Sequence, residues 1–337
     1  MGEQFILGAD VGGTKTHVLI ADEQGRALGF GHAGPGNHDA VGYTGLRRAL
    51  AAALAQALQQ AGLRASQVSA AGWGIAGFDW PSQLPDHQAA LAPLGVAGPS
   101  EIVNDTVVGL LAGAPAGWGV GLVAGTGCNC WGMDRQQRLG RAIGRGRLVG
   151  EAAGAVDLVQ RAIKAIGDEW AQRGPATRLT PAFLEWVGAE TTLAFLEGLT
   201  CERYVVDGAA ARLVFGVAAA GDAAALDCIR WAGRSLAQLS HGVIRQLQFE
   251  ALEFDVVLIG SLFDGGPLLM EAVRNGLQAL APGARLARLE APPVIGGVLL
   301  GMRQLGLDVA ANREQLLAST GELLRWEPTP LELSESP

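Results

Sequence analysis

Short apolar stretches separated by glycine and polar turns dominate the first third of the chain. Such stretches predict strands, whereas longer stretches with apolar residues every three to four positions predict helices. The predicted elements are strands over 5–11, 17–21 and 27–33, a helix over about 39–61, and strands over 69–75 and 101–103. With helices after the last two strands, the order is β-β-β-α-β-α-β-α and ends near 114–117.

The same pattern then begins again. An apolar strand over 120–124 leads into Gly125-Thr126-Gly127 and a strand-like stretch over 130–132, which is a weak internal duplication of the first strand–turn–strand unit. The later predicted elements are helices over about 148–166, 181–187, 205–220 and 222–247, a strand over 254–259, and helices over about 267–280 and 294–305. Asp222 is a suitable N-cap for the longest of these helices.

The length of the chain favours two lobes, because 337 residues exceed a single typical core and 49% hydrophobic residues can fill both. We expect an N-terminal lobe over 1–116, a C-terminal lobe over 117–293, and a helical segment over 294–325 that packs back on the N-terminal lobe. The acidic, proline-bearing tail over 326–337 is expected to be disordered.

Charge and hydropathy exclude several classes of partner. A net charge of −8, with only two lysines among 25 basic residues, argues against a nucleic-acid surface. No stretch approaches the roughly 18 apolar residues of a membrane span, and no basic stretch leads into an apolar core at the N-terminus. We therefore expect a cytoplasmic protein whose partner is a small molecule.

The four cysteines do not form a disulfide framework in a chain of this length. Only Cys128 and Cys130 lie close together, as a C-x-C pair without a second ligand pair nearby. Reduced thiols are therefore expected rather than a zinc or iron–sulfur site.

The first glycine turn joins two strands, whereas dinucleotide fingerprints and Walker loops join a strand to a helix. Gly12 and Gly13 allow close approach of the backbone, so that its N–H groups and the Thr14 and Thr16 hydroxyls can hold phosphate oxygens. Asp10 at the strand end can hold Mg²⁺ through water. The alternative is an ordinary glycine hairpin that binds nothing.

Two further turns follow apolar strands in the second half. Gly125-Thr126-Gly127 repeats the first turn and is expected to face it across a cleft, and Gly260-Ser261 ends a buried strand. Ligands of open α/β sheets usually gather at such strand ends.

These motifs together carry a family resemblance. D-x-G-G-T-K-T at 10–16, Asp105 in EIVNDTVVGLLAG, G-T-G-x-N at 125–129 and VVLIGSLFDGGPLL resemble, in this order, the first phosphate loop, first connecting segment, second phosphate loop and adenosine loop of the actin, hexokinase and heat-shock chaperone superfamily. More narrowly, residues from about 4 to 305 resemble the BadF/BadG/BcrA/BcrD ATPase family and its N-acetylglucosamine kinase members.

The resemblance implies an α/β fold with two ribonuclease H-like (actin-like ATPase) lobes and a cleft between them. It implies ATP and Mg²⁺ as cofactors, a small-molecule sugar as substrate, and it allows a homodimer. The implied ATP contacts are Asp10, Gly12, Gly13, Thr14, Lys15, Thr16, Gly125, Thr126, Gly127, Gly260 and Ser261, with Asp10 also on the metal. The implied sugar contacts are Asn37, Asp79, Asp105, Asn129, Gly144, Gly146 and Glu151.

Phosphoryl transfer to an alcohol needs a carboxylate that accepts the hydroxyl proton. We assign Asp105 to this role, with capping of the following helix as the alternative.

Asn37 suits hydroxyl recognition because its amide both donates and accepts, with a turn residue as the alternative. For Asp79, the alternatives are a contact with the sugar and a cap or turn. Trp80, the next residue, is a candidate for packing beside the sugar ring. His38 is expected to be solvated or to cap a helix rather than to act in catalysis.

The chain departs from the kinase pattern at 144–154. Glu151 stands where the family has a sugar-binding aspartate, the following glutamate is replaced by Ala152, and Arg145 replaces a tryptophan. Arg145 and Arg147 add positive charge, which suits a substrate that bears a carboxylate or phosphate.

We therefore predict an ATP-dependent kinase that phosphorylates the primary hydroxyl of an amino sugar or hexose, with N-acetylglucosamine favoured. One alternative is an ATPase activator of a dehydratase or reductase, which needs cysteines for a bridging cluster. Another is an actin-like ATP-binding module. Sugar-responsive repressors are disfavoured, because no DNA-binding helix pair precedes the first strand. The identity of the sugar, the need for its N-acetyl group and the oligomeric state stay open.

Overall fold

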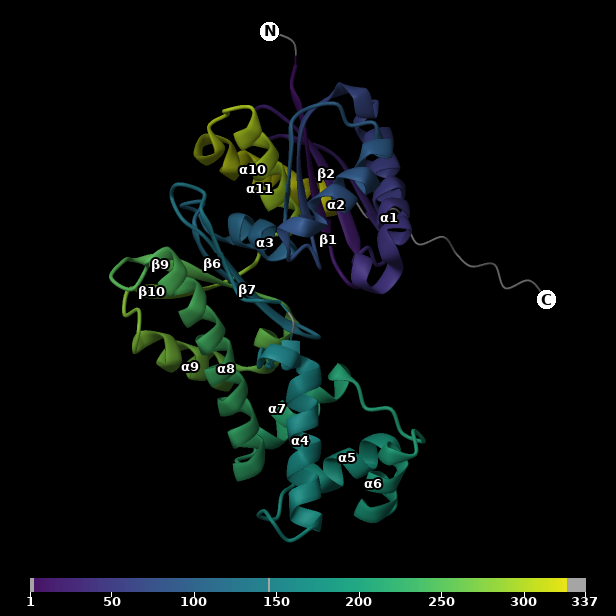
Figure 1. The fold of residues 1–337 in the computed structure, drawn as a ribbon, viewed down its shortest axis with the longest axis vertical. Coiled ribbons are helices and arrows are strands. Elements are labelled where there is room, and N and C mark those ends of the chain that lie inside the picture. The colour runs from purple at the N-terminus through teal and green to yellow at the C-terminus, as the bar shows by residue number, and fades with distance from the viewer. Residues whose placement is uncertain (1–2, 145, 326–337) are drawn as a thin grey trace, which may run out of the picture. The chain divides into compact units, whose positions relative to one another are not determined.

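The structure, a computed structural model, describes residues 3–144 and 146–325 (Figure 1). Arg145, which was expected to add positive charge, lies outside the described residues. The tail at 326–337, which was expected to be disordered, lies outside them as well. The chain divides into two compact units, of which the first runs up to Pro115 and resumes at Ala291, while the second is Ala116–Glu290.

The first unit is built on a five-stranded mixed sheet in the order β3-β2-β1-β4-β5. Its strands are β1 (Phe5–Val11), β2 (Thr16–Asp22), β3 (Ala27–Ala33), β4 (Val68–Ile75) and β5 (Ser100–Val103). Strand β1 pairs antiparallel with β2 and parallel with β4, so it lies in the centre and is largely buried. The carboxyl ends of β1, β4 and β5 therefore meet at one edge of the sheet.

Helices cover both faces of this sheet (Figure 1). They are α1 (His38–Ala61), α2 (Leu84–Leu91), α3 (Asp105–Gly113), α10 (Val294–Gln304) and α11 (Val309–Arg325). Helix α1 packs against β3 and β2, where its buried Leu46 and Leu50 share a core with Leu7 of β1. Helix α10 packs against β1, β4 and α3. Side chains alternate across a strand, so β1 serves both layers.

Glycines allow α10 to approach the sheet backbone to backbone. A Cβ at Gly72 would lie 2.1 Å from the Gly297 carbonyl oxygen, and one at Gly8 would lie 2.3 Å from the Val298 nitrogen. No other residue fits at such distances. The last helices of the chain are thus an integral layer of the first unit.

The second unit repeats this topology. Its sheet has the order β10-β9-β6-β7-β8, with β6 antiparallel to β7 and parallel to β9. The strands are β6 (Gly119–Ala124), β7 (Cys128–Met133), β8 (Leu139–Arg141), β9 (Phe254–Ile259) and β10 (Ala284–Arg288). Both units therefore share one strand order, and the predicted two-lobed α/β fold class is confirmed.

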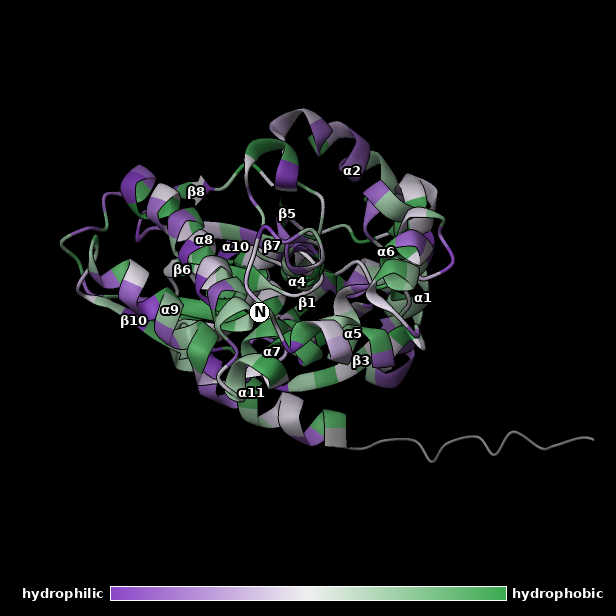
Figure 2. Ribbon diagram, turned by 90° about the horizontal axis from the view of Figure 1, so that it is seen from below, coloured by the Kyte–Doolittle hydropathy of each residue, from purple (hydrophilic) through white to green (hydrophobic). Residues whose placement is uncertain are grey.

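Helices complete the second unit. They are α4 (Ala155–Trp170), α5 (Leu179–Val187), α6 (Thr192–Thr200), α7 (Ala211–Ala219), α8 (Ala223–Leu247) and α9 (Pro267–Gln278). Asp222 caps α8 by accepting from the Ala225 N–H, as predicted. Figure 2 shows hydrophilic and hydrophobic residues along α8, which buries one face against β7 and β8.

Two predicted helix boundaries are wrong. Helix α4 begins at Ala155 and not near 148, because Gly150, with φ of +81°, separates it from a short 3₁₀ turn over Gly146–Val149. Helix α7 begins at Ala211 and not at 205, after a second 3₁₀ turn. Helix α6 and strands β8 and β10 were not predicted, whereas α11 lies within the helical segment expected over 294–325.

Among the described residues, no single helix combines the length and apolar character of a membrane span. One pair bent by 119°, Gly208–Ala219 with Ala223–Leu247, meets these criteria only when the two are taken together.

Candidate functional site

The first glycine turn lies between β1 and β2. It is closed by the Gly12 N–H, which donates to the Lys15 carbonyl at 2.8 Å. Gly13, Thr14 and Lys15 are exposed, and a Cβ at Gly13 would meet no atom within 4 Å. The turn therefore presents open backbone and the Thr14 hydroxyl, which is the arrangement that can hold an anion.

Thr16 does not belong to this open surface. Its side chain is fully buried, and its hydroxyl donates to the Gly34 carbonyl at 3.0 Å. The expectation that the Thr16 hydroxyl holds a phosphate oxygen is therefore wrong, since the first residue of β2 uses its side chain to tie the turn to the segment after β3.

Three carboxylates, Asp10, Asp79 and Asp105, gather near the carboxyl ends of β1, β4 and β5. Burial raises the pKa of Asp10 to about 6, against the lowering effect of the Lys15 charge. Burial, together with the negative charges of Asp10 and Asp79, raises the pKa of Asp105 to about 7. These groups interact because they are close and poorly hydrated. Such a cluster is typical of a site that handles protons or cations.

Asn104, the residue before Asp105, caps helix α3. Its Oδ1 accepts from the Thr106 N–H at 3.0 Å, so the capping alternative for Asp105 is wrong. Asp105 is the first helical residue, where the positive end of the helix dipole favours an anion. The Asn104 amide nitrogen also donates to Asp79 Oδ1 at 3.0 Å. Asparagine before an apolar helical stretch is a strong N-cap signal that could have identified this residue.

Asn37 caps α1 by accepting from the Asp39 N–H at 2.9 Å through Oδ1. The side-chain oxygen of Asn37 thus has a structural role, as the turn alternative expected. Its Nδ2 has no hydrogen-bond partner among the described residues. The Asn37 backbone N–H donates to the Gly12 carbonyl at 3.2 Å. The segment that carries Asn37 is therefore tied directly to the first glycine turn.

The glycine turn of the second unit rests on the start of α4. The carbonyls of Gly125 and Thr126 accept from the Ala155 and Val156 N–H groups at 2.8 and 3.2 Å. A Cβ at Gly154 would lie 2.4 Å from the Gly127 Cα, whereas Cβ atoms at Gly125 and Gly127 would meet nothing within 4 Å. The turn is fixed from one side and open on the other.

Gly260 brings the third turn against the second one. Its φ is +104°, and a Cβ there would lie 2.4 Å from the Ala124 carbonyl oxygen and 3.2 Å from the Gly125 nitrogen. Ser261 follows as an exposed residue that opens a short 3₁₀ helix. The structure thus brings together the two turns of this unit for which the sequence predicted nucleotide contacts.

Glu151 lies in a loop shaped by glycines. Its side chain is buried, with Oε1 accepting from the Ile143 N–H at 2.6 Å, and its own N–H donates to the Gly146 carbonyl at 2.9 Å. Gly144 and Gly146 both have positive φ, which other residues rarely adopt. Asn129 accepts from the Cys130 N–H through Oδ1.

Arg147 does not provide the free positive charge expected in this loop. Its Nε lies 2.6 Å from Oδ1 of Asp157, in the first turn of α4, so the two charges offset each other.

Cys128 and Cys130 lie in β7. The Cys128 thiol donates to the Glu151 carbonyl, and the Cys130 thiol contacts the Ser240 hydroxyl. Burial raises their pKa values to about 11 and about 12, so both are neutral at physiological pH. Neutral thiols are poor metal ligands, which does not favour a cluster-bearing activator.

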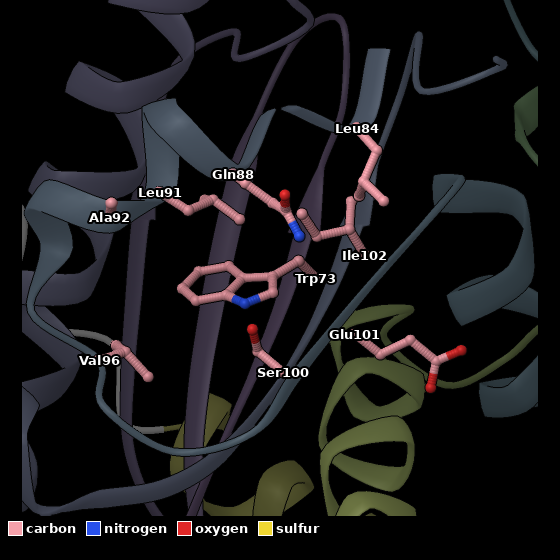
Figure 3. A pocket seen from close by; sticks show the side chains of 9 residues that line it. All are labelled: Trp73, Leu84, Gln88, Leu91, Ala92, Val96, Ser100, Glu101 and Ile102. Carbon is pink, nitrogen blue, oxygen red and sulfur yellow. The ribbon is translucent and has the colours of Figure 1, made fainter. Parts of the chain in front are cut away.

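A pocket in the first unit lies apart from these groups. It is bounded by β4, α2 and β5 and is lined by Trp73, Gln88, Leu91 and Glu101, among others (Figure 3). None of its lining residues belongs to the predicted site.

A comparison with known families decides the affiliation. The profile of the BadF/BadG/BcrA/BcrD ATPase family matches residues 7–301. The chain belongs to this ATPase family. Among curated members of similar sequence, the N-acetylmuramic acid/N-acetylglucosamine kinase of Clostridium acetobutylicum is 23% identical over 302 residues, covering 88% of this chain and 98% of that protein. The N-acetyl-D-glucosamine kinase of Dictyostelium discoideum is 23% identical over 325 residues, covering 90% and 99%.

Solved structures share the fold of this ATPase family member. A candidate N-acetylglucosamine kinase from Chromobacterium violaceum has a TM-score of 0.63 at 23% identity, covering 93% of this chain and 99% of that one. A ROK hexokinase from Thermus thermophilus has a TM-score of 0.55 at 20% identity, covering 90% and 100%. These likenesses support the two-lobed, actin-like sugar kinase fold.

Proposed function

We propose that this chain is an ATP-dependent sugar kinase that phosphorylates the primary hydroxyl of an amino sugar or hexose, with N-acetylglucosamine as the favoured acceptor. The observation that carries this proposal is the cluster of Asp10, Asp79 and Asp105, in which Asp105 has its pKa raised to about 7. The names of the two curated relatives, both kinases of N-acetylated sugars, support the choice of acceptor.

Asp105 acts as the general base. A carboxylate whose pKa lies near the working pH is ionised often enough to accept a proton and basic enough to hold it. It takes the proton of the acceptor hydroxyl while that oxygen attacks the γ-phosphorus and the bond to the ADP leaving group breaks. A raised pKa suits this role, whereas a structural carboxylate normally has a lowered one.

The nucleotide contacts in this proposal are those that the family resemblance implies. In the first unit, the backbone of Gly12 and Gly13, the Thr14 hydroxyl and the Lys15 ammonium hold phosphate oxygens. In the second unit, Gly125, Thr126 and Gly127 hold phosphate oxygens, and Gly260 and Ser261 border the adenosine. Open backbone at Gly13, Gly125 and Gly127 supports the phosphate contacts, since backbone N–H groups bind phosphate at short range.

Asp10 holds Mg²⁺ in this proposal. One hard carboxylate oxygen at a strand end fits an ion that keeps most of its waters. The bound ion offsets negative charge on the phosphates. A cation beside Asp10 also favours its ionised form, which burial alone disfavours.

The acceptor contacts in this proposal are those that the resemblance implies, namely Asn37, Asp79, Asn129 and Glu151, with Gly144 and Gly146 shaping the loop around Glu151. The half-buried position of Asn37 and the uncommitted Nδ2 support a hydroxyl contact. We place this activity in the cytoplasm, where ATP is available.

ADP release in the presence of a panel of sugars, including N-acetylglucosamine, N-acetylmuramic acid and glucose, tests the proposal. We expect turnover to depend on the sugar and to fall about 10²- to 10⁴-fold in Asp105→Asn, the range for loss of a general base. Asp86→Asn, an exposed aspartate of α2, is the matched control and keeps full turnover. Full activity of Asp105→Asn would remove Asp105 as the base, and absence of sugar-stimulated turnover would overturn the kinase assignment.

A further inference from the structure

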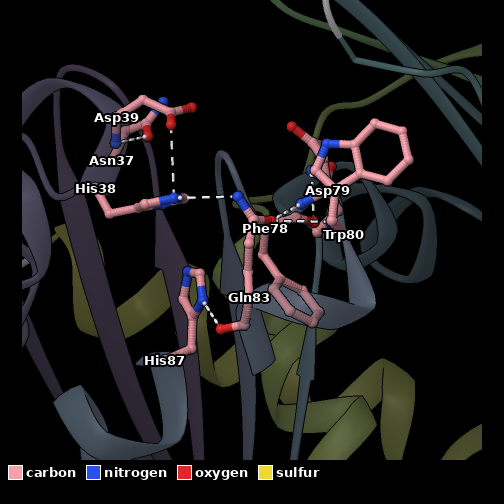
Figure 4. A network of polar contacts seen from close by, with 9 residues as sticks. Asn37, His38, Asp39, Phe78, Asp79, Trp80, Gln83 and His87 are labelled. Carbon is pink, nitrogen blue, oxygen red and sulfur yellow. Dashed lines mark hydrogen bonds and ion pairs between the residues drawn. The ribbon is translucent and has the colours of Figure 1, made fainter. Parts of the chain in front are cut away.

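His38, at the start of α1, contacts the rings of Tyr43 and His87, of which Figure 4 draws His87. The His38 side chain is 7% exposed, so the expected solvated role is wrong. Its ring stacks on Tyr43 at 4.8 Å and meets the edge of His87 at 4.7 Å. A polar residue from another segment, Gln83, reaches His38 and is the one polar side chain drawn between His38 and the loop at 78–80.

The amide of Gln83 has a defined orientation. Its Oε1 accepts from the backbone N–H groups of Asp79 and Trp80, both at 2.9 Å. Its Nε2 is therefore turned the other way and lies 3.3 Å from Nε2 of His38. An amide nitrogen only donates, so this contact is a hydrogen bond when His38 Nε2 is unprotonated. Oδ1 of Asp39 lies 3.5 Å from the same Nε2, and Nδ1 is buried with no hydrogen-bond partner among the described residues.

The backbone of Gln83 is held as well. Its carbonyl accepts from Nδ1 of His87 at 2.8 Å, and burial lowers the pKa of His87, which keeps that ring neutral. Gln83 thus contacts the Asp79 and Trp80 N–H groups, His38, which is distant in sequence, and His87, which is four residues further along the chain.

The loop after β4 and the segment around His38 also touch directly. Gly77 has a φ of +84°, and a Cβ there would lie 2.6 Å from Asn37 Oδ1 and 3.0 Å from His38 Cε1. Their close packing leaves no room for a side chain. The loop after β4 is therefore packed directly against Asn37 and His38.

The first turn of α1 needs such an anchor. Gly42, with φ 66° and ψ 170°, breaks the helix after that turn, so the long remainder of α1 does not fix the position of Asn37. The Asn37 cap, the Gly12 carbonyl and the His38–Gln83 contact fix it instead.

We propose that Gln83 is a positioning residue of the acceptor site, whose amide locks the Asp79–Trp80 loop to His38 so that Asn37 and Asp79 meet the sugar in one fixed arrangement. The proposal rests on the proposed kinase function for the identity of the acceptor, but the lock itself is a property of the first unit. Gln83 touches no reacting group and acts through Asp79 and His38.

Steady-state kinetics of Gln83→Leu tests the role. Loss of the hydrogen bonds is expected to raise the KM for the sugar about tenfold, because each bond contributes roughly a factor of two to twelve. The KM for ATP stays within about twofold, since the first glycine turn keeps its own contacts. Gln88→Leu on α2, whose side chain lines the separate pocket, is the matched control and keeps both constants. An unchanged sugar KM in folded Gln83→Leu, or an equal rise in both KM values, would overturn the proposal.

Gln83→Glu separates positioning from simple packing. The carboxylate still accepts from the Asp79 and Trp80 N–H groups, and it accepts from His38 when the ring carries its proton on Nε2. We expect a near-normal sugar KM in Gln83→Glu. A sugar KM raised as far in Gln83→Glu as in Gln83→Leu would contradict the lock.

Amide hydrogen exchange at Asp79 and Trp80 gives a readout that does not depend on turnover. Exchange is expected to rise about tenfold in Gln83→Leu and to stay at the wild-type rate in Gln83→Glu and Gln88→Leu. If wild-type protein showed no sugar-stimulated turnover, the proposed kinase function would be wrong. The exchange rates would still test whether Gln83 holds the Asp79–Trp80 loop. Unchanged exchange in Gln83→Leu would overturn the lock while leaving the kinase function intact.

Discussion

The side-chain amide of Asn104 donates to Oδ1 of Asp79 at 3.0 Å while its carbonyl oxygen caps helix α3. One residue therefore both starts the helix that carries Asp105 and holds the neighbouring carboxylate. Stability and the alignment of the acidic cluster are linked through this side chain, and the two contributions can be separated by mutation.

Asn104→Ala removes both contributions. We expect a loss of about 1–2 kcal/mol in the free energy of unfolding, the usual cost of a lost N-cap, together with reduced sugar turnover. Asn104→Ser keeps an oxygen that caps α3 but lacks the amide that reaches Asp79. It is expected to retain most of the stability and to lose turnover. Denaturant unfolding and ADP release measure the two effects, and equal stability of the serine and alanine variants would contradict the capping role.

The raised pKa of Asp105 predicts how activity depends on pH. Below about 7 the carboxyl carries a proton and cannot act as a base, so kcat/KM for the sugar should rise with pH and level off above that value. Bound Mg²⁺ favours the ionised form and moves the midpoint downward. A profile that is flat between pH 5.5 and 8 would show that the group acting as base has an ordinary aspartate pKa.

The same group predicts a stability change of opposite sense. The folded pKa of Asp105 is raised above 3.8, so between these values the folded state binds more protons than the unfolded state. Its contribution to stability is fully present below about 3.8 and is lost as pH rises through about 7. Asp105→Asn cannot ionise, so its Tm advantage over wild type should be larger at pH 8 than at pH 5. Thermal unfolding at the two pH values measures this, and a constant difference would argue against the raised pKa.

Gly154 predicts a test of the second glycine turn. In Gly154→Ala the new Cβ would collide with the Gly127 Cα at 2.4 Å, so the turn must shift. We expect a several-fold rise in the KM for ATP with a smaller change in the KM for the sugar. Gly167→Ala is the matched control within α4, since its Cβ meets no atom within 4 Å and alanine favours the helix by up to about 1 kcal/mol. A normal KM for ATP in Gly154→Ala would separate this turn from nucleotide binding.

Thiol chemistry distinguishes the kinase from a cluster-bearing activator. Iodoacetamide at pH 8 should modify the exposed Cys201 first, whereas Cys128, Cys130 and Cys228 resist because burial raises their pKa values to between about 11 and about 12. Mass spectrometry of the alkylated protein measures the order. Anaerobic treatment with iron and sulfide should leave the protein colourless, and uptake of iron that is lost in Cys128→Ser would favour the activator.

The sequence alone predicted the elements whose signal is local. Strands β1, β3 and β9 have the predicted bounds because each is a compact apolar stretch between turn residues. Strands β8 and β10 were missed because they carry charged residues at the edge of a sheet, where only pairing with a neighbour defines them. Helix α6 was missed because it is only nine residues long, which is too short for its apolar positions to show a clear helical period.

In the candidate site too, the sequence predicted residues with a local motif and missed contacts between distant segments. Asp10, Asp105 and the glycine turns have motifs that can be read along the chain, and their contacts with ligands stay predictions. Thr16 was assigned to the wrong partner because the carbonyl that it binds comes from Gly34, beyond the next strand. Gln83 was not identified, because its partner His38 is 45 residues away and only the fold brings them together.

The discontinuity of the first unit has a consequence for how the protein is made. Strand β1 and helix α10, which meet backbone to backbone, are separated by about 290 residues of chain, from Phe5 to Val294. At roughly 5–20 residues per second, a ribosome needs on the order of 15–60 s to deliver the helix after the strand. During that time the continuous second unit can fold, while one face of the first sheet stays uncovered. Nascent chains paused before residue 294 should therefore depend on a chaperone, and release from it should coincide with the emergence of α10.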